Sequence, residues 1–472
     1  MSEGCCSTDR GEGYDLAILG GGSAAFAAAL RGSELGARVL LVNAGAIGGT
    51  CVNVGCVPSK TLIRAAENAH WNGLSRFRGI KPEASRIDFG ELVREKDELV
   101  ASLRQAKYVD VAAGDPRIEV RAGRARLLEP RAIEIDGERF AADRILIATG
   151  TRPARPPIAG LDDPGVWDST SALDASALPR ELVVLGGRYI ALELGQMFAR
   201  LGSRVTIVQR SERIVPDEDP DVSEALADLL RAEGIEIRTG CALERVGSVG
   251  PRRFVWVRHD GRADRLEADA VLAALGRRPN SEGLAEVALD AAGHVRVNEK
   301  LETSVPGIYA AGDVIGDPQY VYAAAYEGGL AAENALLGSS IPRDYTAIPW
   351  VIFSDPQLAG VGLNESQARA ARVEVDVSVL PLDRVPRALA ARDTRGFVKL
   401  LRQSGTDRLV GARILAPEGS EQIMEASLMI RFGLSIQQVA HHFHPYLTQS
   451  EAIKLALLGL DKDVESLSCC AH

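Results

Sequence analysis

Long apolar segments are what this sequence lacks most plainly. Its 472 residues are 46% hydrophobic and 25% charged, yet no apolar run approaches the roughly 20 residues that a bilayer span requires. The start of the chain, from Met1 to Tyr14, is polar and carries neither the basic flank nor the apolar core of a signal peptide. We therefore expect a cytoplasmic protein without a transmembrane helix.

Clustered positive charge is also missing. The formal net charge is −10, and Lys and Arg form no basic stripe along the sequence. A nucleic-acid-binding surface is therefore not expected, because such surfaces neutralise phosphates with grouped Lys and Arg. Small molecules are the expected partners. The length exceeds what one hydrophobic core can serve, so about three domains are expected.

Cysteine is scarce: seven residues are too few for a structural disulfide framework in a cytoplasmic chain of this size. Cys241 stands alone, and we expect it to be a buried apolar side chain. A bridge between adjacent cysteines closes almost no loop and removes little unfolded-state entropy, but a thiolate pair can bind a soft metal ion. The other six cysteines form three close pairs, namely Cys5/Cys6, Cys51/Cys56 and Cys469/Cys470.

Two stretches share the pattern of a strand, a glycine turn, an Ala-rich helix and a second strand. The strands are expected at residues 14–19 and 38–42 in the first stretch, and at 181–185 and 204–208 in the second. Both patterns are typical of βαβ dinucleotide-binding units. Two units imply two nucleotides, which is the number that a flavin enzyme with a nicotinamide reductant needs.

In the first unit, Gly20 permits the tight turn and Gly22 lets the backbone approach a pyrophosphate, which the N–H groups of the next helix would bind. Asn43 ends the following strand, where an acidic residue usually holds a ribose. Its amide can still hydrogen-bond a hydroxyl group, with less charge assistance.

The second unit departs from the pattern twice. Gly186 opens the turn, but Arg188 takes the place of the second glycine and should push the nucleotide away unless its guanidinium meets the phosphates. Gln209 and Arg210 end the second strand in place of an acid. An acid would favour the 2′-hydroxyl of NAD, whereas Arg210 favours the 2′-phosphate of NADP. A solvated surface arginine is the alternative.

Cys51 and Cys56 lie between glycines and a helix expected to begin near Pro58. Two cysteines at this spacing could be half of a tetrahedral zinc site, but no second pair follows at a zinc-finger spacing. Thiols beside helix N–H groups and beside the charge of Lys60 have a lowered pKa, which suits redox exchange.

The segment 49–60, which reads GTCVNVGCVPSK, resembles the redox signature of the flavoprotein disulfide reductases. The pair Thr149-Gly150, the run AAGDV at 310–314 and the order of the segments also fit, so the resemblance covers nearly the whole chain. It implies an α/β fold with two Rossmann-like dinucleotide-binding domains and a C-terminal α+β dimerisation domain. Turn-rich connections support these predicted parts: a polar lead at 1–13, the FAD-binding domain at 14–155, the NADPH-binding domain at 156–276, a central FAD-binding segment at 277–345, the dimerisation domain at 346–460 and a Cys-bearing tail at 461–472.

Within the last domain, strands are expected around residues 373–380 and 397–410, followed by helices from Ser420 onward. This segment contains no glycine turn of the nucleotide-binding type, and we expect it to form an α+β module.

The resemblance also implies roles for single residues. Cys56 would be the thiolate that faces the flavin, and Cys51 the thiol that exchanges with substrate. Lys60 would pair with Glu193 beside the flavin, and Tyr189 would cover the flavin until nicotinamide displaces it. The implied cofactor-binding residues are Gly20, Gly22, Ala25, Asn43, Gly45, Thr50, Lys60, Ala125, Gly150, Gly186, Tyr189, Arg210, Gly276, Asp313 and Val321.

The substrate must follow from what differs within the family. Disulfide-reducing members carry His-Pro-Thr followed by Glu, where the histidine supplies the proton that a leaving thiolate needs. Here the segment from His444 to Glu451 reads HPYLTQSE, and the family spacing of five residues before the carboxylate falls on Tyr446. A phenol with a pKa of about 10 is a poor proton shuttle at neutral pH, so disulfide chemistry is disfavoured.

Tyr446 and the terminal cysteines instead resemble the Hg(II)-reducing subfamily. By that resemblance, Cys469 and Cys470 of one subunit capture Hg(II) and pass it to Cys51 and Cys56 of the other, in an obligate homodimer with its active sites at the subunit interface. Tyr108 matches a second tyrosine of the metal site; a packing tyrosine on an amphipathic helix is the alternative. Cys5 and Cys6 lie in a lead too short for the metal-trafficking domain that such proteins often carry.

We therefore expect an NADPH-dependent, FAD-containing reductase of Hg(II). One alternative is a dihydrolipoamide or glutathione-type disulfide reductase that uses His444 as acid and base. A second alternative is a non-enzymatic Hg(II) sequestration protein, which would bind the ion without consuming NADPH.

Overall fold

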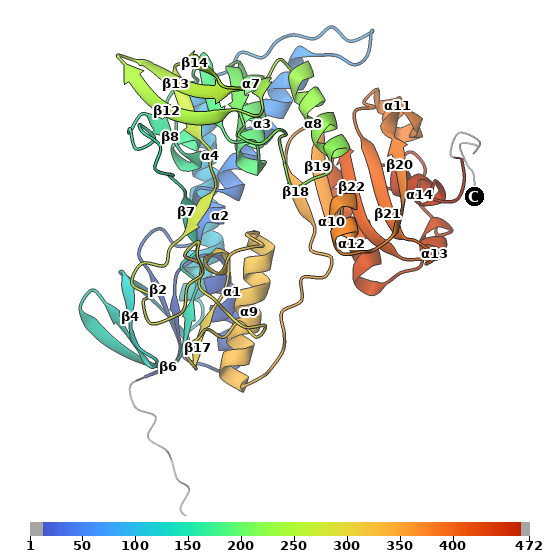
Figure 1. Ribbon diagram of the computed structural model, residues 1–472. Helices are drawn as coiled ribbons and strands as arrows, with labels where there is room; N and C mark the ends of the chain where they lie inside the picture. The colour runs from blue at the N-terminus through green and yellow to red at the C-terminus, as the bar shows by residue number, and fades with distance from the viewer. Residues whose placement is uncertain (1–12, 464–472) are drawn as a thin grey trace, which may run out of the picture. The chain divides into compact units, whose positions relative to one another are not determined.

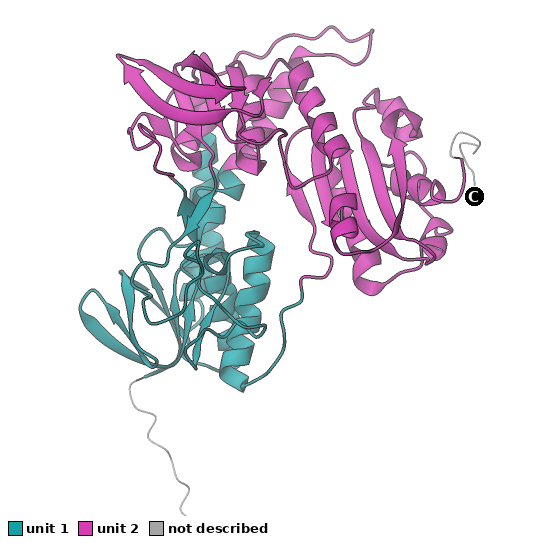
Figure 2. Cartoon of the chain, in the orientation of Figure 1, with its two compact units in different colours: residues 1–58, 95–154, 276–344 teal, residues 59–94, 155–275, 345–472 magenta. Residues whose placement is uncertain are grey.

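The computed structural model describes residues 13–463. The chain forms two compact units, each built from three separate segments (Figure 2). Within the described residues, the first unit comprises residues 13–58, 95–154 and 276–344, and the second comprises residues 59–94, 155–275 and 345–463. The helices and strands confirm the α/β class with two dinucleotide-type sheets and a separate α+β module.

The first unit is built on a seven-stranded sheet. Its strands β1, β2, β3 and β17 run parallel to their neighbours, whereas β4 and β5 continue the sheet antiparallel. In spatial order the strands are β3 (Ile118–Ala122), β2 (Val39–Asn43), β1 (Tyr14–Leu19), β6 (Glu138–Ile147), β5 (Ala132–Ile135) and β4 (Ala125–Glu129), with β17 (Ile308–Ala310) beside β6.

The parallel strands β1 and β2 are mostly apolar and buried, because helices cover this part of the sheet. The helices α1 (Ser23–Glu34) and α9 (Val321–Leu337) lie side by side against it (Figure 1). Alanines on both helices allow this close packing. A short antiparallel pair, β7 (Thr151–Pro153) and β16 (Arg277–Pro279), and the 3-10 turn η2 (Asp313–Ile315) complete the unit.

The second unit contains the second βαβ element. Its parallel sheet has the order β11 (Glu236–Arg238), β10 (Arg204–Val208), β9 (Glu181–Leu185), β15 (Ala270–Ala273) and β8 (Val166–Trp167). The helices α6 (Ser169–Leu173), α7 (Tyr189–Leu201) and α8 (Pro220–Ala232) accompany it, and a meander of β12 (Ala242–Val249), β13 (Arg252–His259) and β14 (Arg262–Ala268) lies beside it.

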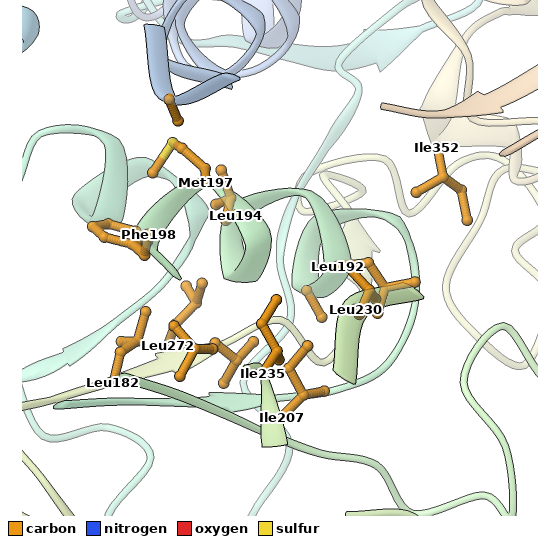
Figure 3. Packing of buried hydrophobic residues seen from close by; sticks show 14 of the residues in the cluster. Leu182, Leu192, Leu194, Met197, Phe198, Ile207, Leu230, Ile235, Leu272 and Ile352 are labelled. Carbon is orange, nitrogen blue, oxygen red and sulfur yellow. The ribbon is translucent and has the colours of Figure 1, made fainter. Parts of the chain in front are cut away.

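The core of this part forms around α7, whose residues are buried along most of their length. Figure 3 shows Leu194, Met197 and Phe198 of α7 with Leu182 and Leu272 of the sheet. Side chains packed on both sides of α7 fix its first turn relative to the strand ends.

The α+β module is a five-stranded antiparallel sheet that carries helices (Figure 1). Its strands, in spatial order, are β18 (Trp350–Ile352), β19 (Gln357–Gly362), β22 (Leu409–Ala416), β21 (Phe397–Gln403) and β20 (Val375–Pro381). The helices are α10 (Glu365–Ala370), α11 (Pro386–Ala391), α12 (Gly419–Phe432), α13 (Ile436–Ala440) and α14 (Ser450–Leu458). The strand expected at 397–410 is two strands, because the chain reverses at Gly405, where φ is +71°.

Three further helices connect these parts: α2 (Gly49–Asn53), α3 (Cys56–Gly73) and α4 (Phe89–Arg104), the last extended by the π-helical turn η1 (Gln105–Val109) and by α5 (Asp110–Ala113). Within residues 13–463, no helix combines the length and the apolar character needed to cross a membrane.

Candidate active site

The two thiols of the redox signature lie on consecutive helices. Cys51 lies in α2, Cys56 is the first residue of α3, and both are half-buried. The amide of Asn53 anchors the segment, since its Nδ2 donates to the carbonyl oxygens of Ile47 and Gly49, at 2.9 Å each. First-turn N–H groups attract negative charge, so the position of Cys56 suits a thiolate.

Tyr108 belongs to the same site. It lies in η1, and π-helical turns inside helices are frequent at functional sites. Burial raises the pKa of Tyr108, and the charges of Cys51 and Cys56 raise it further, so the phenol lies within electrostatic range of both thiols. The ring also packs edge-on against Phe26, with 4.7 Å between ring centroids. Tyr108 thus lies near both thiols and also packs on Phe26, and its role at a metal site stays a prediction.

Tyr322 is a neighbour of the thiols that the sequence analysis missed. It stacks on Tyr320, with 5.4 Å between ring centroids and 15° between ring planes. Burial, then Tyr320 and then Cys56 raise the pKa of Tyr322 well above its usual range. Aromatic residues make up only 5% of the sequence, so the run of Tyr320, Tyr322 and Tyr326 was a signal that could have identified it.

Arg277 is a second residue that the sequence analysis missed. Its Nε donates to Thr151 Oγ1 at 2.7 Å, and one Nη donates to the Thr151 carbonyl at 2.8 Å and reaches Thr50 Oγ1 at 3.5 Å. Thr151 Oγ1 in turn donates to Asp313 Oδ2 at 2.9 Å. Arg277 therefore links the helix of Cys51 to Asp313, which the family resemblance implies is a cofactor-binding residue.

A cavity of about 760 Å³ opens at the carboxyl ends of β1 and β2, which is where dinucleotides bind in such sheets. Gly20 has φ +130°, and a Cβ there would lie 2.1 Å from the carbonyl oxygen of Ala148, so only glycine fits this turn. Arg124, Arg126 and Arg152 line the cavity and offer charge to phosphates. The cavity therefore fits the nucleotide part of FAD.

The expected FAD residues divide into two groups. Gly20, Asn43 and Ala125 line the cavity, and Asn43 Nδ2 donates to the Gly45 carbonyl at 2.7 Å. Lys60 lies in the second unit, and the others lie elsewhere in the same unit as the cavity. Gly22 is the N-cap residue of α1, Ala25 is fully buried within α1, Thr50 and Asp313 lie in the Arg277 network, Gly150 precedes β7, and Val321 begins α9.

Lys60 and Glu193 form an ion pair in the second unit. Lys60 Nζ lies 2.7 Å from Glu193 Oε2, and Glu193 Oε1 accepts the N–H of Phe353 at 3.0 Å. The ring of Phe353 lies under the ammonium group, with 4.6 Å from Nζ to its centroid. Glu193 is only 6% exposed, and each of its carboxylate oxygens accepts a hydrogen bond from one of these two donors.

The second glycine turn lies between β9 and α7. Gly186 has φ +119°, and a Cβ there would lie 2.3 Å from the carbonyl oxygen of Ala274. Arg188 is the N-cap residue of α7, and its guanidinium binds Asp217. Tyr189 follows it, half-buried against Trp350 with 6.0 Å between ring centroids.

Two arginines beyond β10 suit a phosphate. Arg210 is exposed and forms no hydrogen bond or ion pair with any residue of the described part. Arg213 Nε is buried without a hydrogen-bond partner there, and an orphaned buried donor calls for an acceptor. The turn and these donors fit a nicotinamide nucleotide. Gly276, which follows the sheet, also has a positive φ of +101°.

Tyr446 is half-exposed in the loop before α14. His444 Nε2 is paired with Glu425 Oε1 at 2.8 Å, and its Nδ1 lies 3.1 Å from the carbonyl oxygen of His442. Glu451 accepts the N–H of Leu447 at 3.3 Å. His444 is thus paired with Glu425, and not with Glu451, which is the carboxylate that follows the family motif.

Of the five remaining cysteines, only Cys241 lies within the described residues. Cys241 is buried, as expected, and its Sγ donates to the Thr239 carbonyl at 3.3 Å. Cys5, Cys6, Cys469 and Cys470 lie outside the described residues.

Several known proteins are similar to this chain over nearly its full length. Mercuric reductases from Staphylococcus aureus and Streptomyces lividans are each 43% identical to it; the matches cover 100% and 97% of this chain and 86% and 98% of theirs. The mercuric reductase of Shigella flexneri is 45% identical over 97% of this chain and 82% of its own.

Solved structures agree with these sequence matches. The Cu(II) complex of the HOCl-induced flavoprotein disulfide reductase RclA from Escherichia coli has a TM-score of 0.86 at 30% identity, and covers 95% of this chain and 100% of its own. Two family models match as well: that described as pyridine nucleotide-disulphide oxidoreductase at residues 14–328, and its dimerisation domain at residues 348–457. The chain therefore belongs to the pyridine nucleotide-disulphide oxidoreductase family.

Proposed function

We propose that this chain is a cytoplasmic NADPH-dependent reductase of Hg(II), which catalyses Hg(II) + NADPH → Hg(0) + NADP+ + H+. The observation that carries the proposal is the engagement of His444 with Glu425, together with a phenol, Tyr446, at the position that family spacing gives to the proton shuttle. Without that histidine, release of a thiol from a disulfide lacks its acid. The reduction of Hg(II) itself needs no such proton, because the metal leaves as the neutral atom.

FAD, when bound, supplies the two-electron carrier between the nicotinamide and the thiol pair. In this proposal Gly20, Asn43 and Ala125 hold its nucleotide part, and Asp313, fixed by Thr151, holds the ribitol. Lys60 forms an ion pair with the buried Glu193. The 2′-phosphate of NADPH is bound by Arg210.

The thiols act on the metal. Cys51 and Cys56 hold Hg(II) as a bis-thiolate complex while it accepts two electrons that originate from NADPH. In each exchange a new S–Hg bond forms as an old one breaks, and the proton of the incoming thiol passes to the leaving thiolate. Hg(II) therefore never enters water as a free ion. Tyr108 lies within electrostatic range of both thiols, and its raised pKa keeps the phenol neutral.

Delivery comes from a second copy of the chain. The helix α12 carries Met424, Leu428 and Phe432, spaced four residues apart on one face and exposed by 45%, 47% and 69%. Such a stripe needs a partner, and it lies within the region matched by the dimerisation model. In the homodimer that we propose, Cys469 and Cys470 of the partner subunit pass Hg(II) to Cys51 and Cys56.

The proposal is tested by NADPH oxidation in the presence of Hg(II) and excess thiol, compared with oxidised glutathione and with lipoamide. We expect turnover with Hg(II), release of volatile mercury and little turnover with either disulfide. Strong disulfide turnover without Hg(II) turnover would instead support the reductase that uses His444. Tight Hg(II) binding without NADPH consumption would support sequestration.

A further inference from the structure

We propose that Arg188 is a phosphate-binding residue of the nicotinamide-nucleotide site, held by Asp217 in the free protein and exchanged onto the pyrophosphate when the nucleotide binds. The inference rests on the proposed function only in that the site takes a nicotinamide dinucleotide. It explains why this chain has arginine where the dinucleotide pattern has its second glycine.

The backbone at this position makes no demand for glycine. Arg188 has φ −114° and ψ −169°, an extended conformation open to any residue, whereas Gly186 has φ +119°. The pattern calls for glycine here because a Cβ stands in the way of the phosphates. The fold therefore tolerates arginine at this position, and we expect the side chain to affect the binding of the nucleotide.

The first turn of α7 is prepared for an anion. Arg188 is the N-cap residue of this 13-residue helix, and its side chain does not cap the N–H groups. The uncapped N–H groups and the helix dipole attract negative charge. The guanidinium of Arg188 lies on the same turn, so it adds a full positive charge to the partial charges of the backbone.

The guanidinium of Arg188 forms an ion pair with Asp217. The contact is bidentate: one Nη lies 3.0 Å from Oδ1, and the other Nη contacts Oδ2. The side chains of Arg188 and Asp217 are 53% and 62% exposed. An exposed pair of this kind is held weakly in water, so a ligand of higher charge can displace the carboxylate.

Asp217 is the fixed member of the pair. Its carbonyl oxygen accepts Asn364 Nδ2 at 2.9 Å. Two residues earlier, the N–H of Val215 donates to the Gly187 carbonyl at 2.8 Å, which ties this segment to the glycine turn. Arg188 has a long flexible stem, so the guanidinium is the part that moves. The pyrophosphate of a dinucleotide offers the guanidinium the same bidentate contact and carries two negative charges, where the carboxylate of Asp217 carries one.

Two views of Arg188 make opposite predictions. If its stem only obstructs the phosphates, Arg188→Gly restores the pattern and tightens nucleotide binding. If the guanidinium binds the pyrophosphate, the same change weakens binding. Asp217→Asn separates the views further, because an amide no longer competes for the guanidinium.

The experiment measures the dissociation constants of NADP+ and NAD+ for the FAD-loaded protein by titration calorimetry, without Hg(II). We expect Arg188→Gly to weaken both nucleotides about tenfold, since both contain the pyrophosphate. Asp217→Asn should tighten both by a factor of about three, by removing a weak exposed competitor. In the Arg188→Gly background, Asp217→Asn should change nothing.

Arg210→Gln is the matched control. It should weaken NADP+ and leave NAD+ unchanged, because only NADP+ carries the 2′-phosphate. A wild-type preference for NAD+ would contradict the proposed use of NADPH while leaving the effect of Arg188 on NAD+ measurable.

Two results would overturn the proposal. One is unchanged or tighter binding in Arg188→Gly. The other is an equal effect of Asp217→Asn with and without Arg188, which would mean that Asp217 acts by direct repulsion of the phosphates. Arg188→Lys, which keeps the charge but loses the planar bidentate contact, should fall between wild type and Arg188→Gly.

Discussion

At the scale of single residues, Tyr108 makes the most direct prediction for chemistry. Its raised pKa means that the folded protein binds the phenolic proton more tightly than the unfolded chain does. The phenol therefore stays neutral across the physiological range and can donate a hydrogen bond to the thiols or to their metal complex. We expect Tyr108→Phe to lower the kcat for Hg(II) by a factor of roughly ten to a hundred.

The matched control for this change is Tyr14→Phe. Tyr14 also has a raised pKa from burial, but its hydroxyl donates to Glu119 at 2.6 Å, at the start of β1. The two variants should bind FAD equally and differ in Hg(II) turnover. Unchanged Hg(II) turnover in Tyr108→Phe would mean that Tyr108 acts only through the packing of its ring on Phe26, which phenylalanine retains. The sign of the pKa shift adds that the contribution of Tyr108 to stability is lost only as pH rises above about 10.

The residues of the site differed in how far the sequence could predict them. Cys51, Cys56 and Lys60 lie in one continuous signature, so spacing alone grouped them. Arg277 and Thr50 are separated by 227 positions, and their contact depends on how the chain folds back. Tyr322 likewise reaches Cys56 only through the placement of α9. Such contacts follow from tertiary structure and leave no local pattern.

At the scale of helices and strands, periodicity and glycine turns were sufficient for both βαβ units. The strands β1, β9 and β10 have the bounds that the sequence predicted. The interval 397–410 was misjudged, because its two apolar strands are separated by a short turn whose reversal depends on Gly405. The π-helical turn at Tyr108 has no propensity signal, since it inserts one residue into an otherwise regular helix.

A buried cation on β21 gives a prediction for stability. Lys399 is 1% exposed and contacts Asp221 and Glu365 at 2.6 Å each and Asp219 at 3.7 Å. These three carboxylates are also close enough together to resemble a metal site, but the lysine already neutralises them. Burial alone would lower the pKa of Lys399, and its hydrogen bonds with Asp221 and Glu365 raise it overall.

We expect Lys399→Met to lower the free energy of unfolding by about 2 kcal/mol, since two of the three carboxylates are partly exposed and water screens them. Urea unfolding measures this change. Arg204→Met is the control, because Arg204 is 79% exposed and its ion pair with Glu181 lies on the surface; it should have little effect. Equal effects in both variants would contradict the prediction. Above the ordinary lysine pKa, the difference between wild type and Lys399→Met should shrink.

At the scale of the whole molecule, the exposed stripe on α12 predicts assembly. A carboxylate at position 432 would be buried against a second copy without an opposite charge to neutralise it, which is unfavourable. Phe432→Glu should therefore shift the protein from dimer to monomer in sedimentation analysis. Leu389→Glu is the control, because Leu389 is 53% exposed on α11 of the same module and lies outside the stripe. It should remain dimeric. A Phe432→Glu protein that stays dimeric would place the interface elsewhere.

The final prediction concerns the direction of metal delivery between subunits. Replacing Cys469 and Cys470 by Ala should lower turnover of thiol-complexed Hg(II) and leave reduction of the flavin by NADPH intact, because the tail takes part only in ligand exchange. The matched control replaces Cys5 and Cys6, the other adjacent pair, and should change neither rate. Unchanged turnover in the tail variant would remove the tail from the mechanism.

Heterodimers then separate delivery between subunits from delivery within one. One subunit carries Ala at Cys469 and Cys470, and the other carries Ala at Cys51 and Cys56, so each homodimer lacks a complete route. If the tail serves its partner, the heterodimer has one complete route, from the tail of the thiol-deficient subunit to the intact Cys51 and Cys56 opposite. If each tail serves its own subunit, the heterodimer has none. A gain of Hg(II) turnover on mixing and re-associating the two impaired proteins is therefore expected only for delivery across the interface.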